Sequence, residues 1–203
     1  MLRRSLVLVA ALAAALVLAA SALAAGVTIR VEGKTQTIYG SVPAKVDAAN
    51  ALQALDLAST LGEFYYQLSH SSFGDYVSQI GKYPAAGSAG WVFKVNGLSP
   101  PVGADKVTLE DGDAVLWYWA EFGPNGGPPT LTLTPVAGSA NCYLVAARDD
   151  AGKPVAPTSP VLHVDGRRVK AKLGGTGATG CVGKHRGLVR AFAVGAVRSN
   201  SVK

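Results

Sequence analysis

The stretch FGPNGGPP, Phe122 to Pro129, divides the chain near its middle. Proline lacks a backbone N–H, so neither a helix nor a central strand runs through three prolines in eight residues. The charge also changes sign here: residues 26–123 hold 6 Lys or Arg against 10 Asp or Glu, and residues 124–203 hold 11 against 3. We therefore predict an acidic domain at 26–123, a linker at 124–129 and a basic domain at 130–203.

The first residues have the pattern of a secretory signal peptide. Arg3 and Arg4 precede an apolar run from Leu6 to Leu18, and Ala22-Leu23-Ala24 has the small-x-small form of a cleavage site. We expect residues 1–24 to be removed and the protein to be secreted or held on the extracellular face of the cell envelope; an uncleaved anchor is the alternative. No later stretch reaches the ~20 apolar residues of a transmembrane helix, so none is expected after cleavage.

The two cysteines, Cys142 and Cys181, both fall in the basic half. In an oxidising compartment this predicts one disulfide bond. Two free thiols are the alternative, and no arranged His partner indicates a catalytic cysteine.

The acidic half alternates strand and helix signals. Residues 27–33 alternate as a strand, residues 35–40 can return antiparallel to it, and further strands are expected within 64–80. Asp47 is the expected N-cap of a helix that ends at Gly62. Its one apolar stripe consists of Ala48, Ala51, Leu52, Leu55 and Ala58. Such a stripe needs a sheet to cover it, so we predict an α+β domain with one helix on a mixed sheet.

Two more segments complete this half. Residues 91–95 alternate and lead into Asn96-Gly97, a strong hairpin signal, and residues 106–119 predict a strand, a turn at Asp111-Gly112 and a second strand.

These segments also carry a resemblance to a family. GWVFKVNG, Gly90 to Gly97, is followed by VGADKVTLEDGDAVLWYW, Val102 to Trp119. A Gly-Trp strand ending in Val-Asn-Gly, a Gly-Ala turn and a Leu-x-Asp-Gly-Asp turn before a Trp-containing strand resemble secreted domains of unassigned function, similar to the C-terminal domain of transcobalamin and intrinsic factor. Over residues 27–121 the resemblance implies a β-grasp-like fold and small-ligand binding. The helical barrel that completes the cobalamin site of the vitamin carriers has no counterpart here.

The aromatic run VLWYW, Val115 to Trp119, belongs either to the core or to a binding surface. Strand alternation places Val115, Trp117 and Trp119 on one face and Leu116 and Tyr118 on the other. Large aromatics usually pack in the core. If they form a stacking platform instead, the candidate ligand contacts are Trp91, Asn96, Trp117, Tyr118 and Trp119.

The basic half is almost free of helix signals, and strand-like runs such as CYLVAAR and GLVRAFAVGAV predict a small β-sandwich. Its GKPV segment, its VDG strand end and its final VRSNSV strand resemble immunoglobulin-like accessory domains of secreted and surface proteins.

Basic side chains are concentrated in two places in this half. Alternation puts Arg168, Lys170 and Lys172 on one strand face, and Lys184 and Arg186, with Arg190, can extend that surface. They are the candidate contacts for an anionic envelope polymer. A solvated outer face that discourages edge pairing is the alternative.

Together these patterns predict an exported, non-catalytic binding or interaction protein whose partner is an anionic envelope polymer, a glycan or a small molecule. The alternatives are a corrinoid-binding protein, a structural surface spacer and a hydrolase that uses His70. We expect no nucleic-acid partner, no cofactor and no metal site, because His163 and His185 show no metal-ligand spacing with the cysteines. The sequence does not indicate the oligomeric state.

Overall fold

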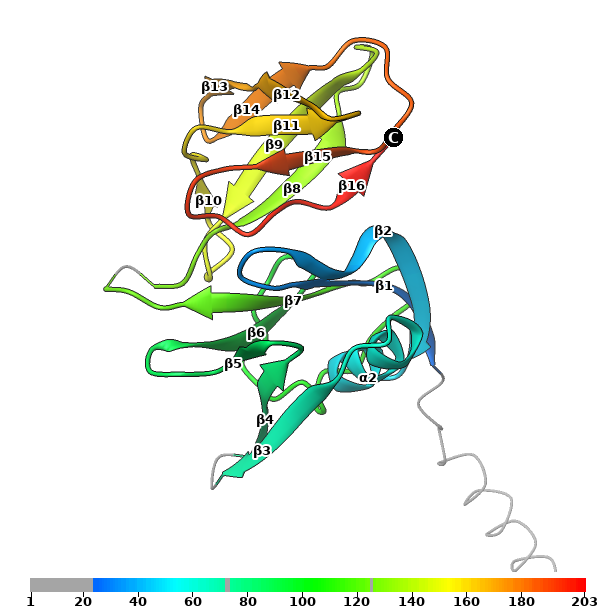
Figure 1. Ribbon diagram of the computed structural model, residues 1–203, viewed down its shortest axis with the longest axis vertical. Coiled ribbons are helices and arrows are strands. Elements are labelled where there is room, and N and C mark those ends of the chain that lie inside the picture. The colour runs from blue at the N-terminus through cyan, green and yellow to red at the C-terminus, as the bar shows by residue number, and fades with distance from the viewer. Residues whose placement is uncertain (1–23, 72–73, 125) are drawn as a thin grey trace, which may run out of the picture.

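The computed structural model describes residues 24–71, 74–124 and 126–203 (Figure 1). Apart from Ala24, the predicted signal peptide lies outside these residues. Across the described ranges, no helix has the length and apolar character needed to cross a bilayer. Figure 1 shows the N-terminal half, residues 24–123, below the C-terminal half, residues 130–203.

The described residues of the N-terminal half form two sheets and one helix. The bounds of its elements are β1 Ala25–Glu32, β2 Thr37–Ala48, α2 Ala51–Leu61, β3 Tyr66–Ser71, β4 Gly74–Ile80, β5 Tyr83–Pro84, β6 Ala89–Val95 and β7 Ala114–Glu121. One sheet has the order β2-β1-β7-β6, in which β1 and β7 are parallel, and the other has the order β3-β4-β5. The buried faces of β1 and α2 share one apolar core with Trp91 and Trp117.

The helix α2 begins three residues later than expected from Asp47 as its cap. Asn50 is the N-cap, and its side chain accepts a hydrogen bond from the backbone N–H of Gln53 at 2.8 Å. Asp47 instead belongs to β2, which stays paired with β1 as far as Ala48. The predicted end at Gly62 is confirmed, because its N–H caps the carbonyl of Ala58.

The predicted fold class of the acidic half, an α+β β-grasp-like domain with one helix on a mixed sheet, is wrong. The chain is mostly β, and its described residues form four sheets with one short helix. Residues 66–84 form a separate three-stranded sheet because β3 and β4 pair with each other as neighbours in sequence. Residues 106–110 form no strand, and only Thr108 bridges to Asn50.

The C-terminal half consists of two sheets. Its strands are β8 Thr130–Pro135, β9 Cys142–Arg148, β10 Pro154–Val155, β11 Val161–Val164, β12 Arg167–Lys170, β13 Lys172–Gly174, β14 Gly177–Cys181, β15 Val189–Phe192 and β16 Ser201–Val202. One sheet has the order β10-β9-β14-β13, with β8 also on β9, and the other has the order β12-β11-β15-β16. Both sheets contribute to one buried core, which is compatible with the predicted sandwich.

The predicted disulfide bond is confirmed. Cys142 on β9 and Cys181 on β14 are bonded, and they are directly opposite each other in the antiparallel register. The bond therefore joins two strands that are already neighbours in the sheet.

The two halves meet across the face of the first sheet that points away from α2. Tyr118 and Ala120 on β7 form a small apolar cluster there with Val197 of the C-terminal half. Beside it, the carboxylate of Glu32, at the end of β1, is surrounded by the guanidinium groups of Arg30, Arg190 and Arg198.

Candidate functional site

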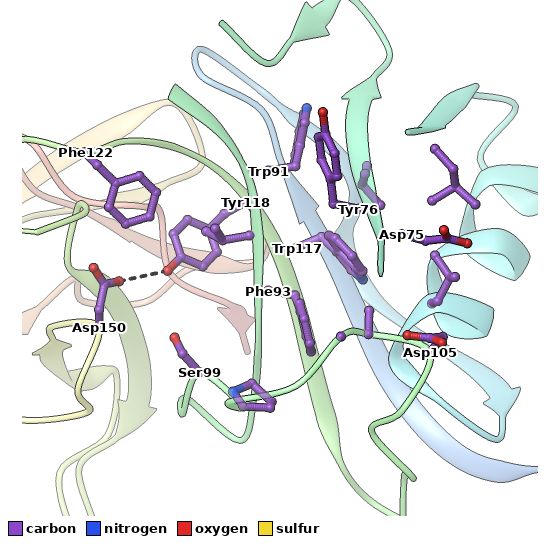
Figure 2. Close-up of a pocket in the computed structure, with 17 residues that line it drawn as sticks. Asp75, Tyr76, Trp91, Phe93, Ser99, Asp105, Trp117, Tyr118, Phe122 and Asp150 are labelled. Atoms are coloured by element: carbon purple, nitrogen blue, oxygen red, sulfur yellow. Dashed lines mark hydrogen bonds between the residues drawn. The ribbon is translucent and has the colours of Figure 1, made fainter. Parts of the chain in front are cut away.

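A cavity of about 350 Å³ lies along the edge strand β6 (Figure 2). Its walls come from α2, β3, β4, β6, β7 and the loop at 99–105, and the C-terminal half contributes Asp150. The lining is mainly apolar and aromatic. Sites for small ligands in proteins typically have volumes of ~300–1,000 Å³ and this kind of lining.

The strand register explains why the aromatic side chains meet. Because β6 and β7 pair antiparallel, Trp91 is opposite Trp119 and Phe93 is opposite Trp117. The Trp-bearing faces of β6 and β7 therefore coincide. The rings of Phe93 and Trp117 are stacked with their centroids 5.0 Å apart, and they form one wall of the cavity.

Hydrogen bonds fix the two indole rings of this wall. Trp91 Nε1 donates to the carbonyl of Tyr83 at 2.8 Å, and Trp117 Nε1 donates to the carbonyl of Ala51 at 3.1 Å. Only 8% of Trp91 and 3% of Trp117 is exposed, so both are core residues that also line the cavity. Both indole rings are therefore held in place by buried hydrogen bonds.

Tyr118 reaches the cavity from the opposite face of β7. Its hydroxyl donates to Asp150 Oδ1 at 3.1 Å, and the backbone N–H of Gly127 donates to Asp150 Oδ2 at 2.7 Å. Burial, and secondly the charge of Asp150, raise the pKa of Tyr118, so its hydroxyl stays protonated. Asp150 thus connects the cavity to the C-terminal half.

The charged side chains that line the cavity within the described ranges are all carboxylates: Asp75, Asp105 and Asp150. Asp75 Oδ1 lies 2.6 Å from Nδ1 of His70. Nζ of Lys106 lies 2.8 Å from Oδ2 of Asp105, and this hydrogen bond lowers the pKa of the Asp105 carboxyl. A largely apolar cavity with acidic groups at its margin favours a ligand with an apolar body and hydrogen-bond donors or a positive charge.

Three of the five predicted ligand contacts line this cavity: Trp91, Trp117 and Tyr118. Asn96 does not, because it occupies the predicted hairpin turn with a positive φ of 52°, and its side chain bonds Asp113 and the N–H of Ala114. Trp119 lines a separate groove, where Nζ of Lys34 lies 5.7 Å from its ring centroid.

Several residues of the cavity were missed by the sequence reasoning. Tyr76, Phe93, Asp105 and Asp150 come from different elements and share no spacing motif. Phe93 alone had a usable signal, since it follows Trp91 at the two-residue period of a strand.

All five predicted polyanion contacts are exposed, but they do not share one strand face. Arg168 and Lys170 lie on β12, whereas Lys172 begins β13 in the other sheet. Lys184 and Arg186 lie in the loop before β15. Arg190 does not extend this surface, because it is bonded to the buried Glu32.

The described ranges contain no group of three or more His, Cys, Asp or Glu side chains that could hold a metal ion. The protein is mostly β, and it has an aromatic pocket beside the edge strand β6.

Comparison with known protein families finds a match to part of the chain only. Residues 48–121 match a family model described as "domain of unknown function (DUF4430)". This match covers β3, β4, β6 and β7, which form much of the cavity, but less than half of the chain. It agrees with a domain of unassigned function and does not show a relationship to transcobalamin.

Among solved structures, a crystal structure from Ruminococcus gnavus ATCC 29149, described as a candidate metal-binding protein, is 17% identical with a TM-score of 0.38. The similarity covers 48% of this chain and 97% of that chain. No curated protein matches the sequence.

Proposed function

We propose that this protein is an exported, non-catalytic binding protein that holds a small ligand in the cavity beside β6. The observation that carries the proposal is the cavity itself. Its walls include indole rings that are already oriented by hydrogen bonds to Tyr83 and Ala51. A pre-formed apolar pocket with a few polar groups is the usual form of a ligand site.

The lining also restricts the ligand. The stacked rings of Phe93 and Trp117 suit a flat or apolar group of the ligand. The carboxylates that line the cavity suit a hydrogen-bond donor or a positive charge on the ligand.

A titration of the mature protein, followed by Trp emission and by calorimetry, tests this function. The panel contains aromatic amines, short glycans, capped peptides and cobalamin. We expect saturable binding of at least one compound, and we expect Ser99→Phe to block it by filling the cavity. Val102→Phe, in the same loop but outside the lining, is the matched control. The proposal fails if no compound binds to the wild-type protein. It also fails if Ser99→Phe binds the compound as well as Val102→Phe does.

Exposed tyrosines provide a second pair of variants. Tyr76 is 53% exposed and lines the cavity, whereas Tyr65 is 55% exposed and does not. Tyr76→Ala should weaken binding and Tyr65→Ala should not. Because both side chains are largely in solvent, neither change should disturb the core.

The basic side chains favour a second binding function for the C-terminal half, attachment to an anionic envelope polymer. Within the described ranges, none of the five predicted contacts forms an ion pair, so their charges face solvent. Binding to purified wall polymer should fall steeply between low and high ionic strength. Equal binding at both would contradict an electrostatic attachment.

Export is the remaining part of the proposal, and the bonded pair of Cys142 and Cys181 supports it. Mass spectrometry of the native protein should find an N-terminus at Ala25 in the extracellular or envelope fraction. An intact N-terminus in the cytoplasm would contradict this part.

A further inference from the structure

The outer edge of β6 has backbone groups directed away from the sheet. β6 is the last strand in the order β2-β1-β7-β6. At one end, Ala86 and Ala89 exchange N–H to C=O bonds of 2.9 and 3.0 Å, and at the other end Val95 and Leu98 do the same. Ala89 and Val95 therefore point their N–H and C=O groups outward, away from β7.

In an antiparallel strand, every second residue directs its backbone N–H and C=O groups to the same side. The backbone groups of Trp91 and Phe93, which lie between Ala89 and Val95, therefore also point outward. Asn96 gives the complementary evidence, since its N–H faces β7 and bonds the carbonyl of Ala114 at 2.9 Å. Within the described part of the chain, the backbone N–H and C=O groups of Trp91 and Phe93 have no protein partner. Such groups are nearly always paired in proteins, with water where nothing else is available.

The cavity runs along these unpaired groups. Trp91, Val92 and Phe93 all line it, and consecutive strand residues point to opposite faces, so the cavity flanks the edge on both faces. Figure 2 shows Tyr118, Phe122 and Asp150 grouped apart from Trp91, Trp117 and Tyr76. We call the first group the tyrosine lobe and the second the tryptophan lobe.

The wall opposite β6 is part of β4, which contributes Asp75, Tyr76 and Val77. Among the residues that the structure describes, β4 pairs with β5 only through Gln79 and Ile80, so Asp75, Tyr76 and Val77 have no strand partner on the side of β5. The cavity thus separates an open strand edge from a strand segment that is itself only partly paired.

We propose that a short extended peptide of a partner protein binds in the cavity by adding a strand to β6. The inference rests on the proposed binding function and names its ligand class. The groups of Trp91 and Phe93 are spaced ~7 Å apart, the two-residue repeat of an extended chain. A second backbone can satisfy all of them, which is the basis of peptide recognition by strand addition.

The two lobes determine the side chains of this peptide. Successive side chains of a strand alternate between faces, so one set enters the tryptophan lobe and the next enters the tyrosine lobe. The tryptophan lobe accepts apolar or aromatic groups. The charged side chains that line the cavity are carboxylates, with Asp150 in the tyrosine lobe and Asp75 and Asp105 on the other side (Figure 2). The cations near them, Lys94, His70 and Lys106, do not line the cavity. Lys or Arg at alternate positions of the peptide, between apolar residues, therefore suits the carboxylates that face the cavity.

Calorimetry and hydrogen exchange on the mature, ¹⁵N-labelled protein test the proposal with the probe acetyl-Lys-Phe-Lys-Val-Lys-Phe-amide. We expect saturable binding and a slowing of amide exchange at Trp91 and Phe93 by about tenfold or more. The amides of Val92 and Lys94 already pair with β7 and should change little. The same peptide with Glu for Lys should bind about tenfold more weakly or worse.

Methylated peptides separate strand addition from side-chain docking. N-methylation of alternate backbone amides in one register should abolish binding, while methylation in the other register should leave it within about threefold. On the protein, Phe93→Pro removes the outward N–H without affecting pairing to β7, and Phe93→Leu keeps the N–H while removing the same ring. The proline variant should bind about fivefold more weakly than the leucine variant.

The outcomes distinguish this inference from the proposed function. Peptide binding without slower exchange at Trp91 and Phe93, or with equal sensitivity to both methylation registers, overturns strand addition. Binding of a small compound that Ser99→Phe blocks, with no peptide binding, also overturns it while the cavity function stands. If neither peptide nor compound binds, both fail. The wild-type exchange measurement decides the question even if Phe93→Pro does not fold.

Discussion

Glu32 joins the two halves through a buried cluster of charges. Its side chain is only 1% exposed, and Oε2 accepts from Arg198 Nε at 2.7 Å and from Thr37 Oγ1 at 3.0 Å. Arg30 and Arg190 bind Oε1. Burial lowers the pKa of Arg30 to about 10, although the carboxylate of Glu32 opposes this effect. One anion therefore compensates three largely buried cations.

Replacing Glu32 with Gln should destabilise the protein by about 3–5 kcal/mol, because three guanidinium groups would stay buried without their counter-charge. The free energy of urea unfolding measures this loss. Glu121→Gln is the matched control, since Glu121 is 72% exposed and lies 3.8 Å from Lys34, and it should cost ~0–1 kcal/mol. A loss at Glu32 no larger than the control would contradict this account of the cluster.

His163 should report on the basic surface. Its ring stacks on Phe192 with centroids 4.1 Å apart, and burial, and secondly the charge of Arg168, lower its pKa below 6.5. Arg168→Gln should raise this pKa in an NMR titration without restoring it fully, because burial is the larger cause. Arg186→Gln should leave it nearly unchanged. An unmoved pKa in Arg168→Gln would show that the two side chains do not interact.

The same shift has a defined effect on stability. A lowered histidine pKa means that the unfolded chain binds more protons than the folded chain below pH 6.5. Stability therefore falls as the pH drops from 6.5 through the folded pKa, and His163→Phe should reduce that slope. This variant retains an aromatic ring for the stack on Phe192.

At the scale of elements, the disulfide bond holds β9 to β14 at one end of their pairing. Its cysteines are 39 residues apart, a loop whose closure contributes roughly 4 kcal/mol in the chain-entropy model. The double variant Cys142→Ser, Cys181→Ser should lower the unfolding free energy by up to about that amount. Reduced wild-type protein should unfold like the double variant. If the variant is as stable as the oxidised protein, the bond does not constrain the unfolded chain.

Elements with local signals could be predicted from the sequence. The turn at Asn96-Gly97 forms as expected because both residues adopt positive φ, and α2 ends at Gly62 as expected. The parallel pairing of β1 with β7 brings together residues about 86 positions apart, such as Thr28 and Ala114, and has no local signature. The start of α2 was misplaced because Asp47 and Asn50 are both good caps and only the length of β2 decides between them.

The candidate site was predicted only in part, because it too is formed by residues that lie far apart in the sequence. The strand periods of 91–95 and 115–119 identified Trp91, Trp117 and Tyr118 as residues to test. Asp150 reaches the cavity only because the two halves pack together, which a composition change at residue 124 could not reveal. Trp119 shares a face with Trp117 but lies farther along β7, where a different groove begins.

For the molecule as a whole, the two halves are joined by buried polar contacts as well as by charge. Lys94 is fully buried, and its Nζ donates to Thr130 Oγ1 at 3.2 Å and to the carbonyl of Asp149 at 2.8 Å. The same ammonium lies 5.8 Å from the centroid of Tyr118. Burial lowers the pKa of Lys94, partly offset by Asp150 and Asp149. Separating the halves would leave these groups without partners.

The halves should therefore unfold together. The three Trp residues all lie in the N-terminal half, so Trp emission follows that half, while hydrogen exchange of β9 and β14 follows the other. In urea both signals should give one midpoint, because a buried Lys94 and a buried Glu32 tie each half to the other. Arg198→Gln should lower both midpoints equally. Two separate midpoints, or a shift confined to one half, would mean that each half is stable alone and that Asp150 is placed at the cavity only by a weak contact.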